Sequence, residues 1–265
     1  MGFEDASILY SERSRPVWLA VGAVAGTEAL MAVHVAPAVI ASGVVTVAIA
    51  GHLLFGGAAR RWGDIPATDE RTAMAALALV PIARLLGMAM PFADLPRWTD
   101  PLLIALPLMA GVLLVARNAG AMGTVLGLRC PTPWFWQLGV AGGGAVLAAL
   151  IATGVLPVVG VGAVDRPTSS DAALVLGAVS LSALVDEFLY RGILQGTLGV
   201  ALGQRVAMWV VVVLYVCASA GHRTPVAVVA FAVVGGYLGW CRLRTGCVLG
   251  GAVAHVLISL AVVYS

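Results

Sequence analysis

The chain alternates between long apolar segments and short polar ones. Nine segments of 16 to 27 residues are nearly free of charge, and a helix needs about 20 apolar residues to cross a ~30 Å hydrocarbon core. Because backbone groups in lipid must hydrogen-bond within their own segment, these segments are expected to be helices. The pattern predicts an all-α polytopic membrane protein, a bundle of eight to nine transmembrane helices. The segments are residues 17–34, 36–55, 72–92, 101–116, 138–163, 172–198, 206–221, 225–241 and 247–264.

The composition supports this class for the whole chain. Its 265 residues are 61% hydrophobic and 11% charged, with a mean hydropathy of +1.01, whereas soluble domains carry roughly 25% charged residues. The net charge of +2 comes without a basic cluster, so no nucleic acid partner is expected. We expect one membrane domain with a polar cytoplasmic lead at 1–16, N-terminal helices at 17–171 and core helices at 172–265.

The arginines and glycines indicate orientation and packing. Ten of the fifteen arginines lie in segments that are cytoplasmic if the N-terminus is inside, and three in segments that are then outside. Since cationic residues favour the cytoplasmic side, the N-terminus is expected there. Three Gly-x-x-x-Gly faces allow close helix approach in lipid, within the chain or in a homo-oligomer. They are Gly139 with Gly143, Gly235 with Gly239, and Gly246 with Gly250.

Charged residues interrupt one of the apolar segments. Asp186 and Glu187 are adjacent there, and Arg191 follows Glu187 by four positions. A charge at membrane depth costs at least ~2.5–3.5 kcal/mol, so such residues usually serve a function. On a helix, Glu187 and Arg191 share a face in the favourable order for an ion pair. Asp186 points about 100° away and is left to face a cavity.

Two histidine-bearing stretches follow the acidic one. His222 ends the apolar segment after Ala218, and His255 lies four residues before Ser259 in the last segment. A lone membrane histidine is often an ordinary hydrogen-bonding residue, and a lone serine often bonds its own helix backbone. Their joint spacing with the acids favours a shared site.

At these motifs the sequence resembles the CAAX-protease and bacteriocin-processing family (CPBP, also called Abi), which includes glutamate-dependent intramembrane endopeptidases. The family pattern is Glu-Glu-x-x-x-Arg, Phe-x-x-x-His and His-x-x-x-Asn, and the resemblance covers about residues 172–265. The corresponding residues are Asp186-Glu187-x-x-x-Arg191, Ala218-x-x-x-His222 and His255-x-x-x-Ser259.

The resemblance implies a role for each position. Asp186 and His222 would activate water, and His255 with Ser259 would stabilise the oxyanion. Glu187 and Arg191 would form a structural ion pair. The implied activity is metal-free hydrolysis of a peptide bond in a peptide or lipid-modified protein, in a bacterial plasma membrane and in contact with membrane lipid.

Three departures from the family pattern bear on catalysis. Asp186 is one methylene shorter than glutamate, and a misplacement of about 1 Å can cost ~100-fold in rate. Ser259 replaces an amide donor, and losing one oxyanion donor costs about 100- to 1000-fold. Ala218 replaces an aromatic residue. The sequence is compatible with a retuned enzyme and with a slow one. It is also compatible with a non-catalytic scaffold or immunity-type protein that binds peptide or lipid in the same cavity.

Other readings of the buried polar groups stay open. A small transporter also buries carboxylates and histidines, but no pair of broken helices recurs in the two halves of the chain. No cofactor is expected, although two histidines and a carboxylate can hold zinc. Glu28 and Arg84 are candidates for a further intramembrane ion pair. The four cysteines lack a Cys-x-x-Cys motif and are interpreted as free thiols.

Overall fold

The fold is taken from a computed structural model of the chain. It describes residues 15–32, 36–55, 69–89, 99–118, 123, 126–159, 172–219 and 224–264. The first fourteen residues of the polar lead and the histidines His34 and His222 lie outside the described residues.

Each of the nine apolar segments coincides with helix in the described part of the chain, and this part contains no strand. The all-helical class is therefore confirmed. The first four helices are α2 (Arg15–Ala32), α3 (Ala36–Phe55), α4 (Asp69–Ala89) and α5 (Thr99–Asn118). Next come α7 (Trp134–Leu150), η1 (Ile151–Val155) and α8 (Leu156–Val159), then α9 (Ala172–Asp186), η2 (Glu187–Leu194) and α10 (Gln195–Leu202). The last three are α11 (Gln204–Ser219), α12 (Pro225–Thr245) and α13 (Leu249–Tyr264).

The outer surface of the bundle is apolar, as expected of a membrane protein. Leu19, Ile40 and Trp134 expose 70% or more of their surface, and large apolar side chains exposed in such number mark a lipid-facing exterior. Three described helical stretches are long and apolar enough to cross a membrane: Trp134–Val155, Ala172–Leu202 and Pro225–Thr245. Shorter apolar helices accompany them, so the count of eight to nine crossings stays a prediction.

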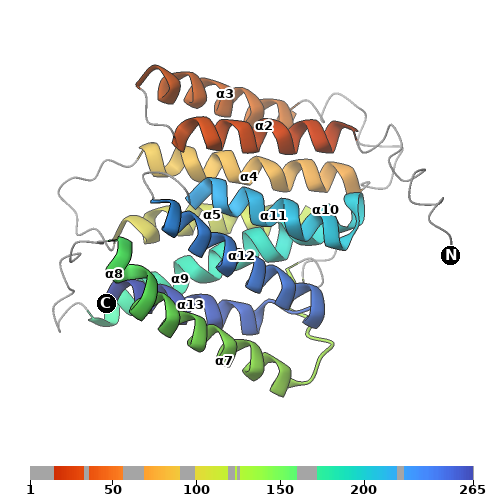
Figure 1. The fold of residues 1–265 in the computed structure, drawn as a ribbon. Helices are drawn as coiled ribbons and strands as arrows, with labels where there is room; N and C mark the ends of the chain where they lie inside the picture. The colour runs from red at the N-terminus through yellow and green to blue at the C-terminus, as the bar shows by residue number, and fades with distance from the viewer. Residues whose placement is uncertain are drawn as a thin grey trace.

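The helices form one bundle (Figure 1). Helices α3, α2 and α4 lie side by side along one edge, and α7 packs on α13 at the opposite edge. The continuous helix α9–η2–α10 lies between them and contacts α4, α5, α11 and α13. The acidic motif is carried by this central helix, so it is surrounded by protein rather than by lipid.

Glycines permit the close approach of the C-terminal helices. A Cβ atom on Gly144 of α7 would collide with Ala254 of α13, and one on Gly143 would collide with the hydroxyl of Tyr237. A Cβ on Gly239 would lie 3.1 Å from Met208. These small residues are therefore used for packing within the chain.

A short segment, residues 126–133, joins the start of α13 to the rest of the bundle. The amide of Val248 donates to the carbonyl of Gly127 at 3.1 Å. Cys130 and Cys247 form a disulfide, with Cα atoms 4.8 Å apart, which is within the usual range. The expectation of free thiols is thus wrong for this pair, because 117 residues separate the two cysteines and only the fold brings them together. Cys217 and Cys241 are free.

Candidate functional site

The acidic motif forms a π-helix rather than an α-helix. Helix η2 spans Glu187–Leu194, and all eight of its residues are buried. A π-helix closes its hydrogen bonds between residues five apart, and such wide turns are frequent at functional sites. Residues four apart lie on the same side of this wider turn, as they do in an α-helix. Arg191 and Glu187 therefore face one another.

One oxygen of Glu187 binds two partners. Its Oε1 atom lies 3.0 Å from Nη1 of Arg191 and 3.0 Å from Nδ1 of His255. The side chains of Glu187 and Arg191 are each 1% exposed and that of His255 is 8% exposed. Since water does not screen this cluster, its charges interact strongly. The contact ties the central helix to α13.

The guanidinium of Arg191 is also held by α11 and α12. It lies over the ring of Tyr215, 4.5 Å from the ring centroid, in cation–π contact. Its Nη2 atom donates to the carbonyl of Gly235 at 3.4 Å. A Cβ on Gly235 would lie 3.0 Å from the Tyr215 ring. Glycine at this position therefore lets Arg191 and Tyr215 pack against α12.

Tyr215 is the centre of an aromatic wall. Its ring meets those of Tyr190, Phe231 and His255 edge to face, with centroids 5.2, 6.2 and 6.2 Å apart. Tyr215 precedes Ala218 by three residues on α11, about one helical turn. An aromatic side chain is therefore present close to where the family pattern has its phenylalanine. Sequence reasoning missed Tyr215, although its position one turn before Ala218 was a usable signal.

The second oxygen of Glu187 is buried without a donor among the described residues. It faces α13, where a Cβ on Gly251 would lie 3.3 Å from this Oε2 atom. Glycine at position 251 therefore leaves room beside the carboxylate. The site thus keeps an acceptor that its own described side chains do not use.

Asp186 differs from Glu187 in its surroundings. It is the last residue of α9 and is only partly buried. The charged groups that act on its carboxyl are His255, Glu187 and Arg191, so it belongs to the same cluster. The acid in hydrogen-bonding contact with His255 is Glu187. Sequence reasoning paired Glu187 with Arg191 alone and did not foresee the imidazole contact.

Ser259 follows His255 by one turn of α13 and is partly buried. Both residues therefore lie on the same side of that helix, as their spacing predicts. His222 lies outside the described residues. The structure thus brings Asp186, Glu187, Arg191 and His255 together, with Ser259 on the adjacent turn.

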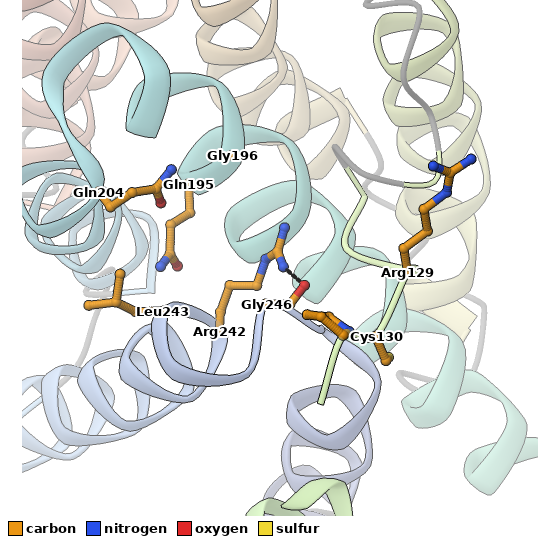
Figure 2. A pocket seen from close by; sticks show the side chains of 9 residues that line it. Arg129, Cys130, Gln195, Gly196, Gln204, Arg242, Leu243 and Gly246 are labelled. Atoms are coloured by element: carbon orange, nitrogen blue, oxygen red, sulfur yellow. Dashed lines mark hydrogen bonds between the residues drawn. The ribbon is translucent and has the colours of Figure 1, made fainter. Parts of the chain in front are cut away.

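A cavity of about 600 Å³ lies at the end of the bundle where α10, α12 and residues 129–131 meet. Figure 2 shows Arg129, Gln204 and Arg242 around it. It is separate from the acidic cluster, but Arg242 Nε donates to the carbonyl of Arg191 at 3.2 Å. One residue that lines the cavity, Arg242, therefore contacts the backbone of η2, the helix that carries the acidic cluster.

Within the described part of the chain, no group of three or more His, Cys, Asp or Glu side chains is placed to hold a metal ion. Residues 168–261 match the family model described as type II CAAX prenyl endopeptidase Rce1-like. The chain matches no curated protein and no solved structure. The matched residues contain the π-helix, the aromatic wall and most of α13, so the similarity to this family covers the part of the chain that carries the acidic cluster.

Proposed function

We propose that the protein is an intramembrane endopeptidase of the CAAX-protease type. The observation that carries the proposal is the buried bridge from Glu187 to Arg191 and His255, with a second acid, Asp186, beside it. The bridge lies inside the segment that matches type II CAAX prenyl endopeptidases. A purely structural ion pair needs neither the imidazole nor the second carboxyl group.

The two acids are suited to different tasks. Glu187 is committed by two charge-assisted contacts of 3.0 Å and is buried, so it holds other groups in place. Asp186 is partly exposed and makes no contact with an ion-pair partner among the contacts described above. We therefore assign the general base to Asp186 and, by its position in the family pattern, a share of the water activation to His222. A base must lie within hydrogen-bonding reach of the proton that it removes.

Glu187 also fixes the proton on His255. An ionised carboxylate only accepts hydrogen bonds, so Nδ1 of His255 must carry the proton in this contact. Nε2 is then the atom that meets the substrate. In the imidazolium form Nε2 also carries a hydrogen, and it can donate that hydrogen to an oxyanion. Ser259, one turn further on, supplies the second donor.

The reaction follows from these assignments. Asp186 takes a proton from water as the oxygen attacks the scissile carbonyl carbon, and the carbonyl electrons move onto its oxygen. His255 Nε2–H and Ser259 Oγ–H stabilise this oxyanion. The carbon–nitrogen bond then breaks, and the proton on Asp186 passes to the leaving amine. Water is consumed, and no oxidant, reductant or further reactant is needed.

The substrate class follows from the setting. A site among apolar helices is reached by a peptide or lipid-modified protein that is itself held at the membrane. We propose an N-terminus in the cytoplasm, since ten arginines then lie on that side. Prenylated carboxy-terminal tails are the first substrates to test, because the matching family acts on them.

The test is a cleavage assay with purified protein in nanodiscs. Pools of quenched fluorescent peptides, prenylated and unmodified, are incubated with wild-type protein and with Asp186→Asn, His222→Ala and His255→Gln. The matched control is Ser180→Ala on the same α9 helix. Wild type and control should cleave at similar rates, and Asp186→Asn should be slower by about 100-fold or more. Equal rates in wild type and all three site variants would remove the proposal, as would a wild type that cleaves no pool.

A further inference from the structure

A second buried ion pair lies in the N-terminal helices, outside the matched segment. Arg84 of α4 donates to Glu28 of α2 from two atoms, with Nε 2.9 Å and Nη2 2.5 Å from the same oxygen, Oε2. The Glu28 side chain is 1% exposed and that of Arg84 is 24% exposed. The pair expected from the sequence is therefore present.

The same arginine reaches a third helix. Nη2 of Arg84 also donates to the backbone carbonyl of Ala218, at 3.1 Å. Ala218 lies in the last turn of α11, which ends at Ser219. The last four carbonyls of a helix have no partner within it, and a positive charge is favourable at that end. Arg84 thus acts as a cap supplied by another helix.

The contact geometry couples the ion pair to the cap. A guanidinium paired only with a carboxylate typically places one nitrogen on each oxygen. Here both nitrogens meet one oxygen of Glu28, and Nη2 keeps a hydrogen for Ala218. Glu28 therefore orients Arg84, and Arg84 holds the end of α11.

The turn held in this way follows a residue that contacts the candidate site. Tyr215, three residues before Ala218, contacts Arg191 and His255. In the sequence, His222 follows Ala218 by four residues. Fraying of this turn would loosen Tyr215 and with it the contacts to Arg191 and His255.

We propose that Glu28 and Arg84 are positioning residues that hold the C-terminal turn of α11 against the site. As a statement about catalysis this rests on the proposed function, but the anchoring itself does not. Neither residue touches the acidic cluster in the contacts described above. The proposal gives the N-terminal helices a task in a site whose chemical groups all come from the C-terminal part.

The test uses a double variant that removes both charges. Glu28→Gln with Arg84→Met leaves no uncompensated buried charge, and replacing both partners of a buried pair by neutral groups is often tolerated. The carbonyl of Ala218 nevertheless loses its donor. Arg117→Met, an exposed arginine at the end of α5, is the matched control. The single variant Arg84→Lys keeps the positive charge and a hydrogen-bond donor. It should therefore retain part of the wild-type protection of the α11 end that the double variant loses.

Hydrogen exchange of the full-length protein in nanodiscs is measured first. In the double variant, amides 216–219 should exchange about tenfold faster or more, because a hydrogen bond from a charged donor is lost. Amides 210–214 should keep wild-type protection. On a cleaved peptide, kcat should fall about tenfold or more, with KM changed less than about twofold, because ordering rather than substrate binding is lost.

Each outcome either supports or overturns the proposal that Glu28 and Arg84 hold the end of α11. Faster exchange confined to 216–219, with a lower kcat, supports positioning. A double variant that matches Arg117→Met in exchange and kcat overturns it, as does faster exchange spread evenly along α11, since the pair would then be merely structural. If wild type cleaves no peptide, the proposed function fails, and exchange at 216–219 alone decides whether Arg84 anchors α11.

Discussion

Replacing Glu187 with glutamine should strongly destabilise the protein. Glutamine keeps the shape but removes the negative charge that faces Arg191 and His255, both at 3.0 Å. Arg191 is 1% exposed, and leaving a buried charge without its partner costs about 3–5 kcal/mol. The Tyr215 ring at 4.5 Å offsets about 1–2 kcal/mol of this. We expect a loss of roughly 1–4 kcal/mol in the free energy of unfolding.

Thermal unfolding in detergent measures the effect through a thiol-reactive dye, because Cys241 is a free and buried thiol. At about 2–4 °C per kcal/mol, the midpoint should fall by roughly 2–16 °C. Arg191→Met should partly rescue Glu187→Gln, since the double variant buries no lone cation. The reasoning is refuted if Glu187→Gln unfolds within about 1 °C of wild type, or if the two effects simply add.

Three further changes test other parts of the account. Gly144→Val should lower the unfolding midpoint by several degrees, since its Cβ would collide with α13 and overpacking costs about 1–3 kcal/mol. Gly142→Val is the control, because a Cβ there meets open space, and it should leave the midpoint unchanged. Equal midpoints for the two variants would contradict this packing. Mass spectrometry of the unfolded, unreduced protein should find two alkylated cysteines, and four after reduction; four before reduction would mean that Cys130 and Cys247 are not bonded. Asp186→Glu, which restores the family residue, should cleave at least as fast as wild type, and a loss of about 100-fold would refute Asp186 as a retuned base.

The sequence predicted the helices and the contacts between residues that lie close together on one helix. The nine apolar segments indicated helices because lipid leaves the backbone no other partner. The four-residue interval from Glu187 to Arg191 indicated their contact, and the interval from His255 to Ser259 indicated a shared helix side. These inferences need only that residues four apart share one side of a helix, which holds for the α-helix and also for the wider turns of η2.

The sequence did not predict what depends on packing between distant helices. The contact of His255 with Glu187 spans 68 residues, and the interval from Arg84 to Ala218 is 134 residues. The π-helix has no signature that helical periodicity reveals. Tyr215 was passed over because a tyrosine in an apolar helix is usually an ordinary packing residue. The disulfide between Cys130 and Cys247 was not predicted either, because the two cysteines are 117 residues apart in the sequence.

The most direct test of the central claim is to follow oxygen from labelled water into the cleavage product. The account predicts that wild-type protein in H₂¹⁸O places one ¹⁸O atom in the new carboxyl group of each cleaved substrate. Asp186→Asn should do so at least about 100-fold more slowly, while Ser180→Ala keeps the wild-type rate. Label incorporated at the same rate with and without the Asp186 carboxylate would contradict the account.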